Sequence, residues 1–252
     1  PETGTRDGVI IHLRANINLL SEVPIARELK AEGIGLYRTE FPFLVRSSFP
    51  AEEEEYRIYR RLCEEMPGKP VIFRTLDIGG EKLPAYWEIA REPNPQLGLR
   101  SIRFSLRHPE QFVQQVRAIL RAGADTEQLG IMFPMLTSLD EFTRARELVA
   151  DSLRALERER LPHHPAPSLG AMVEVPAVVE IIDELCGEAD FLSIGTNDFI
   201  QYLLGVDRMN DQVAYAYRPE HPSVLRRLRR IIDGARRAGK EVGVCGEMAF
   251  DK

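Results

Sequence analysis

Two arginines, two carboxylates and a thiol follow short apolar segments of this 252-residue sequence. Arg38 ends GIGLYR, Arg74 ends VIFR, Glu174 follows GAMV, Asp198 follows FLSIGTN and Cys245 follows VGV. In a barrel of alternating parallel strands and helices, the carboxyl ends of all strands face one mouth. We therefore expect these side chains to converge on one site. Such a set suits an anionic substrate that is held together with a divalent cation.

The arginines allow two interpretations. Arg38 and Arg74 end strongly apolar strands, where a buried guanidinium without an anionic partner is costly. Each arginine either binds the phosphate or carboxylate of a substrate through its planar fork, or forms an ion pair with Glu40 or Asp77. Arg208, in the segment VDRMN, is either a third substrate-binding arginine or a surface residue.

Glu174 and Asp198 are expected at the ends of neighbouring strands. Two carboxylates brought together in apolar surroundings repel unless a cation or a proton lies between them. Magnesium fits such a pair because it is commonly held by one or two carboxylates, with water and substrate oxygens completing its octahedron. The alternative is a general acid and base that work without a metal.

Cys245 and Lys82 are further candidates, each with a structural alternative. Cys245 lies at a strand end beside Gly246, where a thiol is either an inert core residue or a proton donor or nucleophile. Lys82 follows paired glycines in DIGGEKLP, so its ammonium either reaches a phosphate or lies in solvent.

The composition excludes several classes of protein. A net charge of −6 provides no basic field, which argues against binding to nucleic acid or to an anionic membrane. Three scattered cysteines form neither a disulfide framework nor a zinc cluster, and this favours a reducing compartment. We find no signal peptide and no apolar run near the roughly 20 residues that span a bilayer, so we predict a cytoplasmic location.

Strand and helix patterns alternate along the chain and predict an α/β fold. The expected strands lie at 9–15, 34–38, 71–77, 130–135, 170–175, 191–196 and 241–246. The expected helices lie at 21–32, 51–66, 110–122, 139–158, 177–186 and 221–238, and a long loop covers 78–99. This order predicts a (β/α)8 TIM-type barrel, truncated before its last strand and helix. An open doubly wound sheet is the alternative, but no Gly-rich dinucleotide loop or P-loop follows any strand.

Seven motifs in order resemble a known family. They are GIGLYRTEFPF, RTLDIGGEK, NPQLGLRSIR, IMFPML, MVEVPA, FLSIGTNDFIQYLLGVDRMN and VCGEMA, and they are similar to the phosphoenolpyruvate-binding domain of enzyme I of the bacterial phosphotransferase system. The resemblance implies a barrel domain over 9–252, incomplete at its C-terminus, with 1–8 as a linker. It also implies a homodimer that binds phosphoenolpyruvate with Mg2+ and yields pyruvate. The phosphoryl group would pass to a histidine on a separate domain and then to a phosphocarrier protein.

The resemblance also assigns roles to residues of this sequence. Cys245 would protonate the enolate at its methylene carbon, with Arg38 and Arg74 as further catalytic residues. Glu174 and Asp198 would hold the magnesium. The expected substrate-binding residues are Arg38, Arg74, Lys82, Arg100, Asn197, Arg208 and Glu247. The sequence departs from the family around Lys82, where GGEKLP stands in place of a segment with an aspartate before the lysine.

Two alternative functions are compatible with the sequence. Pyruvate phosphate dikinase and phosphoenolpyruvate synthase share much of the barrel, and a non-catalytic module could sense phosphoenolpyruvate and dimerise. No segment resembles the phosphohistidine loop of the family, so we expect the chain to be inactive without that domain. Pro42, after Phe41, resembles the nitrogen-regulatory branch of the family rather than the sugar branch.

Overall fold

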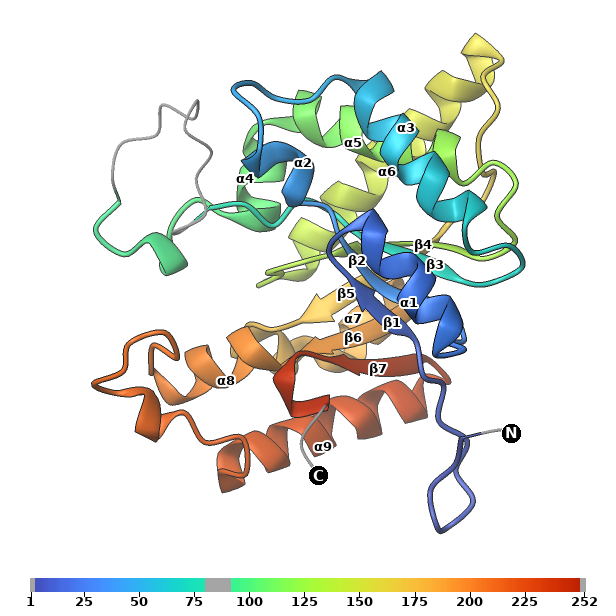
Figure 1. Ribbon diagram of the computed structural model, residues 1–252. Helices are drawn as coiled ribbons and strands as arrows, with labels where there is room; N and C mark the ends of the chain where they lie inside the picture. The colour runs from blue at the N-terminus through green and yellow to red at the C-terminus, as the bar shows by residue number, and fades with distance from the viewer. Residues whose placement is uncertain (1–2, 80–91, 250–252) are drawn as a thin grey trace.

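Seven parallel strands form the framework of the molecule (Figure 1). The computed structural model describes residues 3–79 and 92–249, so Lys82 lies outside the described residues. Each strand pairs with the next strand in sequence. The strands are β1 (Ala15–Ile17), β2 (Ile34–Arg38), β3 (Val71–Arg74), β4 (Leu129–Phe133), β5 (Ser168–Val173), β6 (Phe191–Gly195) and β7 (Glu241–Cys245). The prediction of seven parallel strands separated by helices is confirmed.

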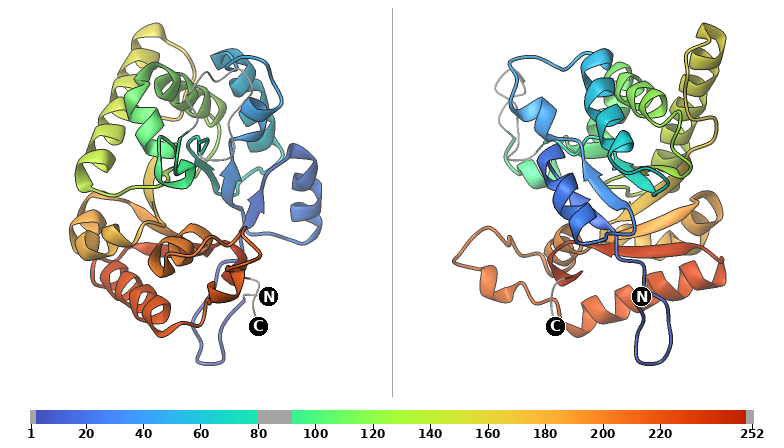
Figure 2. Two further views of the ribbon diagram at one scale, coloured as in Figure 1. Left: turned by 90° about the vertical axis from the view of Figure 1, so that its left-hand side faces the viewer. Right: turned by 45° about the vertical axis from the view of Figure 1, so that its right-hand side comes forward.

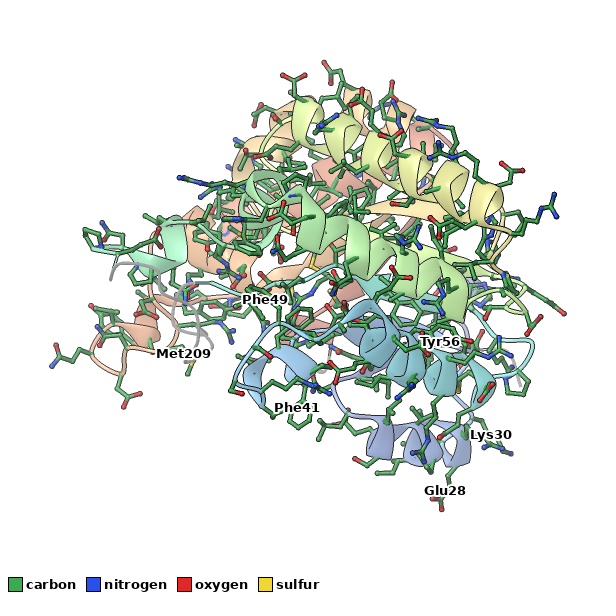
Figure 3. The ribbon with its side chains drawn as sticks, turned by 90° about the horizontal axis from the view of Figure 1, so that it is seen from above. Glu28, Lys30, Phe41, Phe49, Tyr56 and Met209 are labelled. Atoms are coloured by element: carbon green, nitrogen blue, oxygen red, sulfur yellow. The ribbon has the colours of Figure 1, made fainter. Side chains whose placement is uncertain are left out.

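Helices cover the outer face of this sheet (Figure 2). They are α1 (Val23–Glu28), α2 (Phe41–Leu44), α3 (Glu52–Glu64), α4 (Ser101–Arg107), α5 (Pro109–Ala122), α6 (Leu139–Glu159), α7 (Ile182–Glu188), α8 (Thr196–Leu204) and α9 (Pro222–Arg237). From above, α3, α5 and α6 lie side by side (Figure 3). The guanidinium carbon of Arg121 on α5 lies 4.3 Å from the ring centroid of Tyr56 on α3. None of the helices in 3–79 and 92–249 is long and apolar enough to cross a bilayer.

The sheet curls until its two edges approach each other. Arg14, which precedes β1, places Nη1 2.8 Å from Oε1 of Glu241, the first residue of β7. The two edge strands of an open doubly wound sheet lie on opposite sides of the molecule, so this contact rules out that alternative. The fold is an incompletely closed α/β barrel, as the sequence predicts.

Alternation along the strands separates an outer core from an inner one. Side chains such as Tyr37 and Phe73 point outward and pack edge to face, with ring centroids 5.5 Å apart, between the sheet and its helices. The neighbouring positions point inward and form a small apolar cluster inside the curl. Its buried members are Leu36, Ile72, Met132 and Met172.

The N-terminal part of the chain differs from the sequence expectation. Residues 9–14 form no strand except for an isolated bridge between Gly4 and Ile10, so the strand expected at 9–15 is wrong; β1 begins at Ala15. Apolar residues in this segment, such as Val9 and Leu13, are about half exposed. Strand propensity alone did not order them, because the preference of such residues for strands depends on burial against neighbours.

Several helical segments also differ from the expectation. The helix expected at 21–32 is a short 3-10 turn followed by α1, and the helix expected at 177–186 divides into a 3-10 segment and α7. The chain turns soon after α1, where Lys30 adopts a φ of 59°. Helices α2, α4 and α8 were not expected, because each is short and directly adjoins a loop or a strand.

Candidate active site

The period of two along each strand carries three charged side chains into the mouth of the barrel. Arg38 and Arg74 are register partners on β2 and β3. Each lies two residues beyond an inward-pointing apolar residue of its strand, and so does Glu174 after Met172. Side chains two positions apart share one face of a strand, so these charges continue the inward-pointing rows of the apolar cluster toward the carboxyl ends of the strands.

Arg74 is held by two acids. Its Nη2 donates a hydrogen bond to Glu40 Oε1 at 2.7 Å, and its Nη1 lies 3.2 Å from Asp77 Oδ2. All three side chains are buried. Burial lowers the pKa of Arg74, but the carboxylates of Glu40 and Asp77 outweigh it, so the pKa is raised and the charge is retained. The ion pairs named as the structural alternative for this arginine are therefore present.

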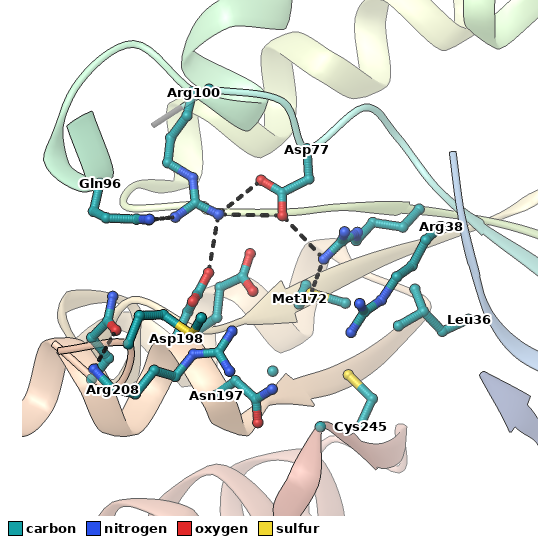
Figure 4. A pocket seen from close by; sticks show the side chains of 17 residues that line it. Leu36, Arg38, Asp77, Gln96, Arg100, Met172, Asn197, Asp198, Arg208 and Cys245 are labelled. Atoms are coloured by element: carbon teal, nitrogen blue, oxygen red, sulfur yellow. Dashed lines mark hydrogen bonds and ion pairs between the residues drawn. The ribbon is translucent and has the colours of Figure 1, made fainter. Parts of the chain in front are cut away.

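Arg100 connects two walls of the site. Its Nη2 lies 3.0 Å from Asp77 Oδ1 and 3.1 Å from Asp198 Oδ2. Its Nη1 donates hydrogen bonds to Gln96 Oε1 at 2.7 Å and to the Tyr202 hydroxyl at 3.0 Å. The guanidinium thus joins the loop after β3 to helix α8. This contact holds the two sides of the mouth together (Figure 4).

Unused donors remain on the arginines of the site. Within residues 3–79 and 92–249, Arg38 forms no ion pair. The Nε atoms of Arg38, Arg74 and Arg100 are buried and have no hydrogen-bond partner among the residues that the structure describes. Buried donors of this kind normally find an acceptor, so three unmet N–H groups in one pocket indicate an acceptor-rich ligand.

Glu174 is held in the same pocket by the backbone. Its Oε1 accepts a hydrogen bond from Met135 N at 2.6 Å, and Met135 has a φ of 56°. Burial, followed by the charge of Asp198, raises the pKa of Glu174 to about 8. A carboxyl group that resists ionisation beside a second carboxylate is a site where a cation would be favourable. In the described part of the chain, no three His, Cys, Asp or Glu side chains group to hold a metal.

Asn197 and Asp198 were expected at the end of a strand, but the structure places them in the first turn of α8. The N-terminal turn of a helix is the end that favours acidic side chains, and Asp198 lies there. Asn197 Oδ1 accepts a hydrogen bond from Glu247 N at 2.9 Å, and Glu247 Oε1 lies 3.4 Å from Arg208 Nη1. Through these contacts Glu247 touches the site, although its side chain is mostly exposed and does not line the pocket.

Cys245 ends β7 opposite Gly195 of β6. The Ser193 hydroxyl donates to its Sγ at 3.4 Å, and the thiol in turn donates to the Ile194 carbonyl at 3.5 Å. Burial raises the pKa of the Cys245 thiol, so it keeps its proton at neutral pH. Cys186 is buried on α7, away from this pocket.

A pocket of about 370 Å³ collects most of the expected residues. It is lined by Arg38, Arg74, Arg100, Glu174, Asn197, Asp198, Arg208 and Cys245. Sequence reasoning did not assign Leu36, Gln96 or Met172 to the site, and it treated Asp77 only as a possible ion-pair partner. The strand period would have found Leu36 and Met172, because each lies two residues before a residue that was assigned. Gln96 lies in the motif NPQLGLRSIR, from which only Arg100 was assigned to the site.

Comparison with known proteins agrees with this geometry. Residues 2–252 match the family described as PEP-utilising enzyme, PEP-binding domain, where PEP is phosphoenolpyruvate. The chain is 47% identical over 249 residues to a phosphoenolpyruvate-protein phosphotransferase of Geobacillus stearothermophilus, which covers 99% of this chain and 43% of the relative. A relative of the same name from Listeria monocytogenes is 43% identical over 251 residues, covering 100% of this chain and 44% of the relative. The chain thus spans less than half the length of these relatives.

A solved structure supports the fold alone. A HpcH/HpaI aldolase/citrate lyase family protein from Burkholderia cenocepacia J2315 superposes with a TM-score of 0.53 at 16% sequence identity. The match covers 95% of this chain and 82% of that chain. From the family match over nearly the whole sequence and the identity to the curated relatives, the chain belongs to the family of phosphoenolpyruvate-binding domains of PEP-utilising enzymes.

Proposed function

We propose that this chain binds phosphoenolpyruvate with Mg2+ and donates its phosphoryl group to a histidine on a separate domain, releasing pyruvate. The observation that carries the proposal is one pocket lined by four arginines, three carboxylates and a thiol. The names of the curated relatives support the reaction, and they favour it over that of a dikinase. The intact set of arginines and thiol favours an enzyme over a silent sensor.

The arginines would recognise the two anionic groups of the substrate. Arg38 and Arg74 present buried Nε atoms without acceptors, which suit carboxylate and phosphate oxygens. Arg208 and Asn197 line the same pocket and would contact the phosphate. Arg100, which is held by Asp77, would complete the set. Lys82 and Glu247 are retained as proposed substrate-binding residues on the family resemblance.

Glu174 and Asp198 would hold the metal. Both are oxygen donors in one pocket, and burial together with the charge of Asp198 raises the pKa of Glu174 despite Arg74 and Arg100, so a further cation at this place would be favourable. Two carboxylates fit Mg2+ because this ion completes its shell with water and phosphate oxygens. When bound, it would supply positive charge against the phosphate oxygens.

Phosphoryl transfer would break the bond between phosphorus and the enol oxygen and form a bond between phosphorus and a histidine nitrogen. The arginines would neutralise charge on the reacting oxygens throughout. The enolate left behind would take a proton on its methylene carbon from the Cys245 thiol, giving pyruvate. The thiolate would regain its proton from water.

The remaining parts of the proposal concern the whole protein. We expect a homodimer that acts in the cytoplasm and passes the phosphoryl group on to a carrier protein. The nitrogen-regulatory branch and the boundary between linker 1–8 and domain 9–252 stay predictions.

A transfer assay tests the reaction. The chain is mixed with a phosphohistidine domain of a curated relative, Mg2+ and phosphoenolpyruvate labelled on phosphorus. We expect label on the histidine domain and one pyruvate for each phosphoryl group. Tight binding of phosphoenolpyruvate without transfer or pyruvate would contradict the proposal and favour the sensing module.

A further inference from the structure

The pocket has two chemically different ends. Its outer end carries charged and polar side chains such as Arg100, Asp198 and Arg208. Its inner end is lined by Leu36, Met172 and the Cys245 thiol, as the close view shows (Figure 4). The substrate proposed above has the same asymmetry, because its phosphate and carboxylate are charged whereas its methylene carbon is apolar.

The inner wall is rigid. Leu36 and Met172 are 2% and 1% exposed, and they belong to the buried cluster with Ile72 and Met132 against which Cys245 packs. Met172 Sδ also lies 3.9 Å from Arg74 Nη1. Side chains packed at the density of a protein interior do not move aside at low cost, so this wall has a defined position relative to the charged layer.

Strand geometry fixes the distance between this wall and the charges. Leu36 precedes Arg38 by two residues, and Met172 precedes Glu174 by two. Two residues of a strand span roughly 7 Å, which is the scale of a three-carbon phosphate. With its anionic groups on the arginines, a bound phosphoenolpyruvate therefore places its third carbon near the wall and the thiol.

We propose that Leu36 and Met172 are specificity-determining residues that contact the methylene carbon of phosphoenolpyruvate beside Cys245 and exclude substituents on that carbon. The inference rests on the proposed function. A close apolar wall also keeps water from the carbon that the thiol protonates. One additional methyl group in a well-packed pocket changes discrimination by about 10- to 200-fold.

A comparison of the affinities of two ligands tests this role. Calorimetry measures the affinities of phosphoenolpyruvate and of its (Z)-3-methyl analogue in the presence of Mg2+. We expect the wild-type chain to prefer the unsubstituted ligand by roughly tenfold or more. Met172→Ala and Leu36→Ala create space and should reduce that preference to near unity or reverse it. The ratio of affinities cancels a general weakening of the site.

Met132→Ala is the matched control. Met132 is the same residue type in the same buried cluster, but it does not line the pocket, so its removal should leave the preference unchanged. If Met172→Ala does not fold, Met172→Val makes the same test with a residue suited to a strand.

The outcomes separate this inference from the function on which it rests. A wild-type chain that binds phosphoenolpyruvate while the Met172 and Leu36 variants keep the wild-type preference would overturn the inference and leave the proposed function intact. A preference lost equally in Met132→Ala would also overturn it. Failure of the wild-type chain to bind phosphoenolpyruvate at all would reject the proposed function itself.

Discussion

At the scale of single residues, the pocket is a balanced set of buried charges. Arg74 lies between Glu40 and Asp77, and Arg100 lies between Asp77 and Asp198. Each guanidinium is thus neutralised within the protein, yet in the described part of the chain each keeps a buried Nε without an acceptor. The arginines are positioned by acids and still offer donors to a ligand. Preorganised donors of this kind need little rearrangement when charge develops in a reaction.

Replacement of the thiol separates binding from turnover. We expect Cys245→Ala to bind phosphoenolpyruvate within a few-fold of wild type, because Cys245 carries no charge toward the phosphate. Turnover should fall by on the order of 10²-fold or more, since the enolate loses its proton donor. The measurement is pyruvate release in the transfer assay beside calorimetric affinity. Cys186→Ala, a buried cysteine outside the pocket, is the control, and normal turnover by Cys245→Ala would remove the thiol from the mechanism.

At the scale of elements, backbone geometry positions the carboxylates. Among residues 3–79 and 92–249, two residues with a positive φ that are not glycine contact them. Met135 donates its N–H to Glu174, and the Ser101 hydroxyl donates to Asp77. Unusual backbone conformations cost free energy and persist where the surroundings require them. Their place beside two acids of the pocket fits a functional constraint on these turns.

Gly195, at the end of β6, leaves space for Glu174. A Cβ at this position would lie 2.7 Å from Glu174 Oε2, so Gly195→Ala must displace the carboxylate. We expect the fold to persist while Mg2+-dependent affinity for phosphoenolpyruvate falls roughly 10- to 100-fold, as for other residues that orient metal ligands. Calorimetry with Mg2+ checks this. Gly187→Ala is the matched control, because no atom lies within 4 Å of its added Cβ; equal affinities in all three proteins would contradict the prediction.

Helices α3 and α5 enclose a buried acid away from the pocket. The Tyr59 hydroxyl donates to Glu55 Oε1 at 2.8 Å, and Gln114 Nε2 donates to Glu55 Oε2 at 3.1 Å. Gln115 Nε2 donates hydrogen bonds to Glu55 and to the Tyr59 hydroxyl. Gln115 Oε1 accepts a hydrogen bond at 2.8 Å from the backbone N–H of Leu76, the residue before Asp77. Burial raises the pKa of Glu55 to about 7 despite these hydrogen bonds.

Glu55 makes stability depend on pH. Its pKa is higher in the folded chain than the ordinary value of 4.5, so the folded state binds the proton more tightly. The contribution of Glu55 to the free energy of unfolding should be greatest below pH 4.5. It should fall as the pH rises through 7, by about 3 kcal/mol in total. Urea unfolding at pH 5.5 and pH 8 measures the difference in the free energy of unfolding.

Glu55→Gln should remove most of this pH dependence, since the amide does not titrate. Glu53→Gln on the same helix is the control, because Glu53 is half exposed and its surface ion pair with Arg121 contributes little to stability. Equal free energies of unfolding of the wild-type chain at both pH values would contradict the prediction. A pH dependence of stability that persists in Glu55→Gln would show that another group causes it.

The sequence predicted the strands well and the turns poorly, for physical reasons. β2 to β7 are short, mostly apolar runs, and a polar residue or the thiol at or just after the end of each strand except β4 marks the mouth of the barrel. Arg38, Arg74, Glu174 and Cys245 could therefore be placed together from local patterns alone. The ion pairs of Arg100 with Asp77 and Asp198 could not, because they depend on how a loop and α8 approach each other across the mouth. The roles of these residues in catalysis stay predictions.

At the scale of the whole molecule, the curl of the sheet creates the site. Five of the seven strands end in residues of the pocket or are directly followed by them, and residues as distant in sequence as Arg38 and Cys245 line one cavity. The contact of Arg14 with Glu241 shows how closely the two edges of the sheet approach at the opposite end. The interior is divided into an apolar base and a charged mouth, so a small ligand with one apolar end and two anionic groups fits it.

The most direct test of the central claim is the affinity of this chain for phosphoenolpyruvate, measured by calorimetry with Mg2+ and with a chelator. We predict saturable binding to one site with Mg2+, and roughly tenfold or greater weakening both with the chelator and in Glu174→Ala. Glu184→Ala, an exposed glutamate on α7, should bind as wild type. Absence of binding with Mg2+ would contradict the account. So would an affinity in the chelator, and in Glu174→Ala, that equals the affinity of the wild-type chain with Mg2+.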